Sequence, residues 1–194
     1  VEASTKKDRT SEIFGNPMSK KVIRKAQKSK QKNQKKYGDD SKVNYQCIIR
    51  DNSCIGGPLG VKNVVVTRKE GKGSFDEEKG VIVGNIRMGF GHYRISMAIA
   101  SAAHALGYTP YWMDLNSYPE TTCTKLISAQ NELYSLGSRI SQKSKLFNKF
   151  VWEPVNYEGF RQLSYNAADQ KNAELMAPVY ANIPKDIPVV ATHV

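Results

Sequence analysis

A short apolar run that leads into closely spaced glycines most constrains what this chain can fold into. Residues 81–86 are largely apolar and β-branched without alternation, which indicates a strand buried on both faces. Gly89 and Gly91 follow, and apolar or small residues then recur at helical spacing over residues 95–106. Residues 108–115 form the next apolar run. This order of strand, turn, helix and strand predicts a βαβ unit with a right-handed crossover.

The remaining patterns extend this unit to both sides. Val64, Val65 and Val66 predict a strand within residues 61–69, and the charged, glycine-rich residues 70–79 predict a loop. Helical patterns cover residues 120–151, with an interruption expected near Gly137, and residues 161–182, with a kink or early end at Pro178. A strand is expected at residues 189–192. The predicted fold class is therefore α/β, a Rossmann-like parallel sheet flanked by helices.

The positive charge is concentrated at the start of the chain. Residues 1–42 hold 13 of the 29 Lys and Arg residues but 5 of the 18 acidic ones. They carry few large apolar groups, so they predict a disordered basic N-terminal tail. The predicted division is this tail at residues 1–42, an irregular or β lead-in at residues 43–79, and a Rossmann-like domain at residues 80–194.

A basic tail of this kind favours anionic partners. It could approach an anionic membrane surface by electrostatic attraction. Nucleic acid is an unlikely partner, because the run lacks the interleaved aromatic residues of a base-stacking surface. A solvated tail without a partner is the simplest interpretation.

The cysteines and the hydropathy indicate a cytoplasmic chain. Cys47, Cys54 and Cys123 form no CxxC pair and have no histidine at zinc-ligand spacing, so no metal site is expected. An odd number of cysteines without a signal peptide indicates a reducing compartment. No apolar run reaches the ~18–20 residues of a membrane span, so membrane contact would be peripheral.

The ends of the sequence suggest a piece of a longer protein. The chain opens on Val1, while Met18 begins a stretch typical of an ordinary start. The strand expected at residues 189–192 stops as it reaches the edge of the sheet where ligands bind. We therefore expect a second half to follow.

The glycine turn has the chemistry of an anion site. Gly89 and Gly91 allow a tight turn, and the first free N–H groups of the following helix would face a ligand such as phosphate. The dinucleotide fingerprint does not fit, because Arg94 stands where its third glycine should be. The Walker A motif is absent as well. A glycine turn made only for packing remains an alternative.

The motif resembles the opening of a GT-B glycosyltransferase. The sequence Gly89, Phe90, Gly91 and His92 precedes a helix rich in small residues and a strand that ends in Asp114. It is similar to the group of monogalactosyldiacylglycerol synthases and the lipid II-forming N-acetylglucosaminyltransferase (glycosyltransferase family 28). The late segment that ends in His193 resembles a later strand of these enzymes. The resemblance covers residues 80–194 and implies the acceptor-side, N-terminal GT-B domain.

The resemblance implies a role for each residue of the motif. His92 would be the catalytic residue, either as general base or in orienting an acceptor hydroxyl. Candidate substrate- or phosphate-binding residues are Gly89, Phe90, Gly91, Tyr93, Arg94, Asp114 and His193. Arg94 matches no signature of the family, and it would either bind phosphate or lie solvated on the helix. Asp114 is equally well explained as a cap for the next helix.

The resemblance also implies the partners of the reaction. The donor would be a nucleotide-diphosphate sugar, the acceptor a lipid or another hydroxyl compound, and no cofactor is expected. Two other functions remain open from the sequence. One is a UDP-sugar epimerase of related fold. The other is a non-catalytic protein that docks on membrane or RNA through the basic tail.

Overall fold

The computed structural model describes residues 8–69, 71, 74–87 and 90–192. The chain forms two compact units. The first contains Val1–Asp39 and Glu132–Met176, and the second contains Asp40–Asn131 and Ala177–Val194. Each unit is described by itself.

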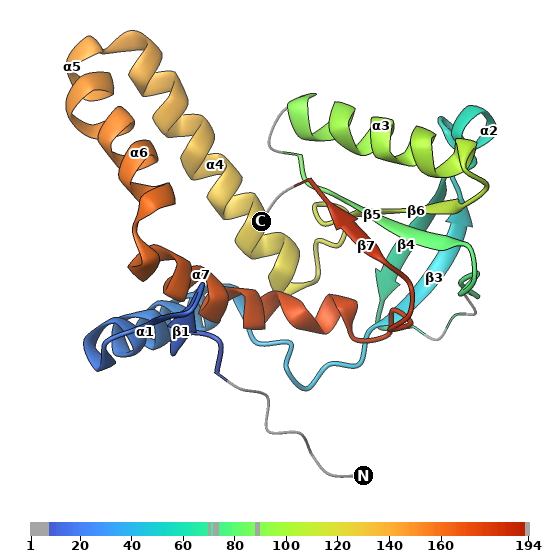
Figure 1. The fold of residues 1–194 in the computed structure, drawn as a ribbon, viewed down its shortest axis with the longest axis horizontal. Coiled ribbons are helices and arrows are strands. Elements are labelled where there is room, and N and C mark those ends of the chain that lie inside the picture. Colours follow the sequence, from blue (N-terminus) through green and yellow to red (C-terminus); the bar gives the residue numbers. More distant parts are fainter. Residues whose placement is uncertain (1–7, 70, 72–73, 88–89, 193–194) are drawn as a thin grey trace. The chain divides into compact units, whose positions relative to one another are not determined.

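The second unit is built on a five-stranded sheet with the order β3-β4-β6-β5-β7 (Figure 1). β3 pairs antiparallel with β4, and the other neighbours pair in parallel. The prediction of an α/β fold with a mostly parallel sheet is therefore confirmed. The strands are β3 (Gln46–Asp51), β4 (Lys62–Thr67), β5 (Gly80–Asn85), β6 (Thr109–Asp114) and β7 (Val189–Ala191).

Helix α3 (Phe90–Ala105) lies on one face of the sheet, between β5 and β6 in the chain (Figure 1). Its small residue Ala100 is buried and packs with Val83 and Trp112, which lets helix and sheet approach closely. The helix ends before Gly107, whose φ of 83° is the left-handed conformation that glycine adopts readily. The predicted βαβ unit is confirmed.

The opposite face of the sheet is buried as well, as the lack of alternation in β5 predicts. Ile82, Tyr111 and Met113 alternate with the residues that face α3, and all three are buried. The Tyr111 hydroxyl accepts a hydrogen bond from the Asp76 N–H (2.8 Å), which ties the loop before β5 to β6. The short helix α2 (Gly56–Leu59) and the 3-10 turn η2 (Ala177–Tyr180) complete this unit.

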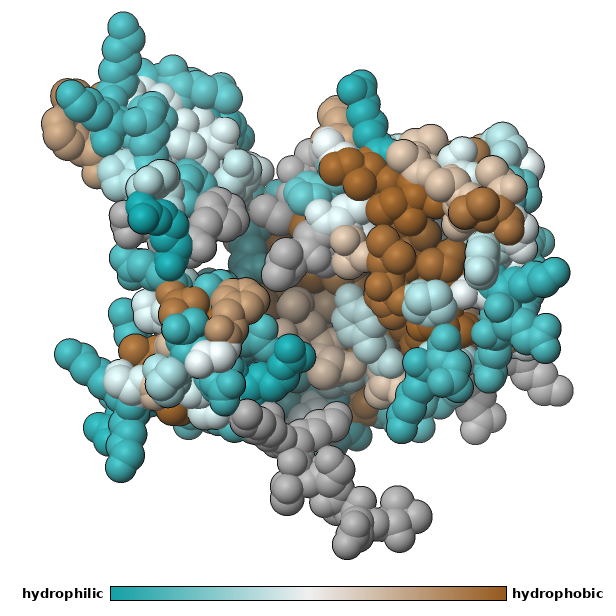
Figure 2. Space-filling model, in the orientation of Figure 1, coloured by the Kyte–Doolittle hydropathy of each residue, from teal (hydrophilic) through white to brown (hydrophobic). Residues whose placement is uncertain are grey.

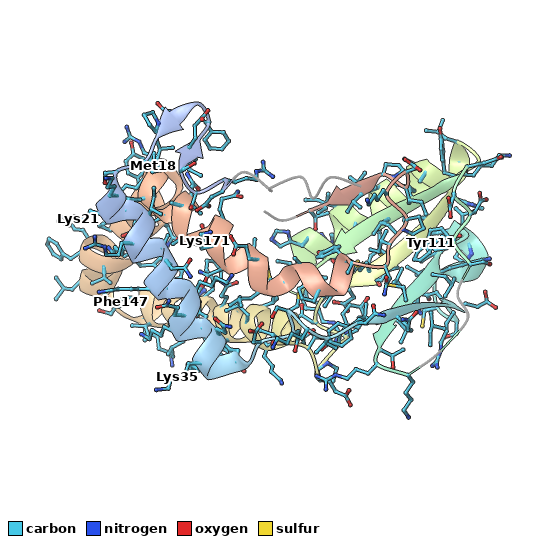
Figure 3. All side chains as sticks on the ribbon, turned by 90° about the horizontal axis from the view of Figure 1, so that it is seen from below. Met18, Lys21, Lys35, Tyr111, Phe147 and Lys171 are labelled. Atoms are coloured by element: carbon cyan, nitrogen blue, oxygen red, sulfur yellow. The ribbon has the colours of Figure 1, made fainter. Side chains whose placement is uncertain are left out.

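Within the described residues 8–39, the first unit corrects the prediction of a disordered N-terminal tail, which was made for residues 1–42. Lys20–Tyr37 form helix α1, which packs along α7 (Leu163–Met176). Figure 3 labels Lys21 and Lys35 near the two ends of α1, and Lys171 on α7. Before α1, Glu12–Ile13 (β1) pairs with Asn16–Pro17 (β2).

Small residues explain why α1 is ordered despite its few large apolar groups. Ala26 of α1 and Ala167 of α7 are buried in one cluster with Ile13, so the two helices approach closely. The Ser19 hydroxyl caps the start of α1 by accepting from the Val22 N–H (3.3 Å). The prediction was wrong here because it counted apolar bulk along α1 alone and not the partner helix.

A helical hairpin forms the rest of the first unit. Helix α4 (Thr122–Lys143) begins in the second unit, and its residues from Glu132 onward belong to the first. It leads into α5 (Lys145–Phe147), the π-helical turn η1 (Asn148–Trp152) and α6 (Glu153–Arg161). The interruption predicted near Gly137 is wrong, because α4 is continuous there. A Cβ at Gly137 would lie 2.1 Å from Cζ3 of Trp152, so this glycine makes room for the Trp152 ring.

The structure groups the chain differently from the predicted division at residue 79. β3 and β4 belong to the same sheet as β5 and β6, and the chain passes between the two units after residues 39, 131 and 176. Among the described helices, none combines the length and the apolar character needed to cross a bilayer.

Two buried thiols are expected to lower the stability of the fold as the pH becomes alkaline. Burial raises the pKa of Cys47 to about 11 and that of Cys123 to about 12. In the unfolded chain these thiols ionise near pH 8.5, so unfolding releases protons above that pH and becomes easier. We expect the free energy of unfolding to fall by about 1 kcal/mol per thiol between pH 8 and 9.5. Urea titrations of wild type and Cys123→Ala measure this; an identical pH dependence in both would contradict it.

Candidate functional site

The carboxyl ends of the parallel strands form a point where ligands commonly bind in α/β proteins. β5 lies between β6 and β7 in the sheet. After β5, the chain passes through α3 to β6, which pairs with one edge of β5. β7 pairs with the opposite edge of β5. In α/β sheets, ligands bind outside the carboxyl ends of the strands at such a divergence. Helix α3 follows β5 in the chain, so its start lies at this edge of the sheet.

The residue that follows β7 holds His92 at this edge of the sheet. Its Nδ1 lies 2.8 Å from the backbone carbonyl oxygen of Thr192. A carbonyl oxygen only accepts hydrogen bonds, so Nδ1 carries the proton and donates it. In the neutral ring, Nε2 then has the free lone pair. The half-buried His92 therefore presents Nε2 as a hydrogen-bond acceptor when the ring is neutral.

The buried hydroxyl of Ser96 links the segments of the chain that position His92. Ser96 is fully buried one turn along α3, and its Oγ lies 3.3 Å from Oδ1 of the buried Asn85. The same Oγ lies 3.4 Å from the Gly84 carbonyl oxygen and 3.4 Å from Oγ1 of Thr192. Ser96 therefore joins β5, α3 and the residue that anchors His92.

Three of the predicted residues, Phe90, Tyr93 and Asp114, line a pocket on the β6 side of β5. This pocket has a volume of about 440 Å³, within the range of small-molecule sites. It is lined by Asn85, Ile86, Arg87, Phe90, Tyr93 and Asp114. Phe90 is exposed, and the ring of Tyr93 packs edge-on against Trp112 at 5.5 Å. His92 is on the same helix end but is not a lining residue of this pocket.

An ion pair separates this pocket from a second one. The Arg87 Nε donates to Oδ2 of Asp114 (2.7 Å), and its guanidinium also donates to the Ser117 hydroxyl (2.9 Å). Asp114 further accepts from the Asn116 N–H (3.0 Å). The second pocket, of about 380 Å³, includes Arg87, Asp114 and Trp112 in its lining. The Arg87–Asp114 pair thus fixes the loop after β5 to the loop after β6.

Removing Asp114 should destabilise the second unit more than removing Arg87. Asp114→Ala removes the acceptor of three donors and should lower the free energy of unfolding by about 2–3 kcal/mol. Arg87→Ala should lower it by about 1 kcal/mol, because the Arg87 side chain is 63% exposed. Denaturant titrations of both variants and the double variant test the pairing. Strictly additive effects would contradict a coupled pair.

Figure 2 shows hydrophobic residues gathered over β7 and the adjacent side of α3. Val189 and Val190 of β7 and Ile95 of α3 are among the exposed large apolar residues. β7 is the last strand of the sheet on this side among the described residues. An exposed apolar surface therefore lies on β7 and α3, next to the two segments whose contact positions His92.

The predicted site residues fall into separate groups in the structure. Asp114 lines the pocket and binds Arg87, and it does not cap α4. Asp40 accepts from the Thr122 N–H at the start of α4 instead (2.6 Å). Arg94 is exposed on α3, and a Cβ at Gly91 would meet open space. Gly89 and His193 lie outside the described residues.

The sequence interpretation missed the residues that hold the site together. Arg87, Ser96 and Thr192 were not among the candidates. Arg87 could have been found, because it follows β5 directly and parallel strands bring it near the end of β6. Ser96 and Thr192 gave no such signal, since their contacts depend on how β7 joins β5.

Among the described residues, no group of three His, Cys, Asp or Glu side chains is placed to bind a metal ion. The family model that matches residues 12–194 is described as Domain of unknown function (DUF6937). No curated protein and no solved structure matches the chain.

Proposed function

We propose a function from the site itself, because the chain belongs to a family described as a domain of unknown function, DUF6937. In this proposal the second unit is the acceptor-side domain of a GT-B glycosyltransferase. The enzyme transfers a sugar from a nucleotide-diphosphate sugar to the hydroxyl group of a lipid or another acceptor.

The observation that carries the proposal is the state of His92. Transfer to a hydroxyl requires a group that takes the hydroxyl proton as the bond to the sugar forms. Nδ1 of His92 is occupied by the Thr192 carbonyl at 2.8 Å, which leaves Nε2 as the acceptor. The ring is positioned by a hydrogen bond to its other nitrogen, as in catalytic histidines generally. His92 thus has the properties of a general base.

Two further features support binding of the donor and acceptor. Free N–H groups at the start of α3 favour a phosphate, and the open space beside Gly91 lets a ligand approach the backbone. The pocket lined by Phe90 and Tyr93 offers aromatic surface for an acceptor. The reason for proposing a nucleotide-diphosphate sugar as the donor is the resemblance of the glycine turn to family 28 glycosyltransferases. A lipid acceptor would place the enzyme at the cytoplasmic side of a membrane.

The test is identification of the product. The natural full-length protein is incubated with a set of UDP-sugars and with hydroxyl acceptors, including diacylglycerol, and the products are identified by mass spectrometry. We expect a glycosylated acceptor together with UDP. Free epimerised sugar formed without any acceptor would replace the proposal with an epimerase. Intact UDP-sugar throughout, in a protein that also fails to bind it by calorimetry, would reject both enzymes.

A further inference from the structure

The helical hairpin of the first unit leaves many of its described apolar side chains exposed. We call residues 132–161 the apolar hairpin; they comprise the second part of α4 with α5, η1 and α6. Every residue described over 132–157 is at least partly exposed. Its large exposed apolar residues include Leu133, Leu136, Ile140, Leu146, Phe150 and Val155. Apolar surface that gathers in this way marks an interaction site.

The spacing of these residues places them in stripes along the helices. Leu133, Leu136 and Ile140 are three and four residues apart on α4, so they share one face of that helix. Leu146 and Phe150 are four residues apart on the returning segment. The hairpin is held together by other residues, since Tyr134 and Trp152 pack at 5.2 Å across it. The stripes are therefore free to contact something outside the hairpin.

The charges around the stripes identify the chemistry of that partner. The hairpin carries five basic and three acidic residues, and the acidic ones are Glu132, Glu153 and Glu158. Four of the basic residues, Arg139, Lys143, Lys145 and Lys149, lie between Glu132 and Glu153, where no acidic residue occurs, and all four are exposed. Lysine is depleted from the core of protein–protein interfaces. Basic residues beside aromatic and aliphatic ones are instead typical of helices that lie in the interface of an anionic bilayer.

From these observations we propose that the apolar hairpin docks on the surface of anionic phospholipid membranes. Leu146, Phe150 and their neighbours enter the boundary between head groups and acyl chains, and the lysines contact lipid phosphates. Tyr134 and Trp152 are suited to the head-group level, where such rings gather. This surface differs from the predicted one, which was the basic segment now seen as α1. The proposal rests on the first unit alone and does not depend on sugar transfer.

The experiment measures binding of the whole chain to vesicles by sedimentation. One set of vesicles is phosphatidylcholine, and the other is an equal mixture of phosphatidylcholine and phosphatidylglycerol. We expect wild type to prefer the anionic vesicles. Leu146→Ser with Phe150→Ser should weaken this binding at least about tenfold. Lys143→Gln, Lys145→Gln and Lys149→Gln together should weaken it about 100-fold on the anionic vesicles.

Matched controls separate the hairpin from other exposed residues. Leu106→Ser with Phe14→Ser removes equally exposed residues of the same types outside the hairpin and should leave binding unchanged. Lys25→Gln, Lys28→Gln and Lys32→Gln remove three exposed lysines of α1 and should lower binding less than the hairpin triple variant. Circular dichroism confirms that each variant is folded.

Several outcomes would overturn the proposal. One is wild-type binding that is equal on neutral and anionic vesicles or absent from both. Another is loss of binding in the α1 variant with full binding in both hairpin variants. Dimerisation of wild type that Leu146→Ser with Phe150→Ser abolishes, without vesicle binding, would assign the stripes to a second copy of the chain.

Discussion

Replacing His92 by asparagine or by glutamine is expected to lower the rate of sugar transfer by about 10²–10⁴-fold. The two substitutions separate the two ring nitrogens. The asparagine amide nitrogen lies near the position of Nδ1 and can still donate to the Thr192 carbonyl, but it supplies no base at Nε2. The glutamine amide reaches the position of Nε2 and can hold a hydroxyl without taking its proton. A general base predicts loss in both variants, with kcat falling more than KM changes.

The rates of the two variants show whether His92 acts as a general base or only holds the acceptor in position. If His92 only holds the acceptor, His92→Gln should retain most of the wild-type rate while His92→Asn loses it. His104→Asn is the matched control, because His104 is an exposed histidine near the other end of α3. A wild-type rate in both His92 variants would remove His92 from the mechanism. Nitrogen-15 NMR of the wild-type imidazole gives an independent test, since the Thr192 hydrogen bond requires the proton on Nδ1.

Gly80→Ala is expected to have the largest effect on stability of the substitutions considered. A Cβ at Gly80 would lie 2.3 Å from the backbone oxygen of Asp76 and 2.9 Å from Cε2 of Tyr111. Neither neighbour can yield easily, because Asp76 is held by its N–H to the Tyr111 hydroxyl and Tyr111 is buried. We expect the free energy of unfolding to fall by about 3 kcal/mol.

Gly91→Ala is the control for this prediction, since a Cβ there meets nothing within 4 Å. It should leave the free energy of unfolding unchanged or slightly raised, because alanine favours a helix over glycine. Guanidinium titrations of both variants give the comparison. Equal stability of Gly80→Ala and wild type would show that the turn before β5 can shift. Gly91→Ala also reports on the site, because a folded variant with weakened UDP-sugar binding places the donor at this backbone.

Local patterns were sufficient for the centre of the fold. The buried run at residues 81–86 and the helical spacing after it correctly predicted β5, α3 and β6, because each element forms from neighbouring residues. Gly107 marked the end of α3 for the same local reason. Gly137, in contrast, was interpreted as a helix break, while the structure uses it to accommodate Trp152. A glycine within a helical pattern does not reveal from sequence whether it breaks the helix or makes room for a ring.

The sequence by itself determined the parallel α/β core and placed His92 at the start of the helix that follows β5. The tertiary structure decided which atoms meet there. The bond from His92 to Thr192 joins residues 100 positions apart, and Lys30 reaches Glu174 across 144 positions. Such contacts depend on the packing of whole elements, which no local pattern encodes. For the same reason only the structure showed that α1 is ordered on α7 and that the apolar hairpin is left uncovered.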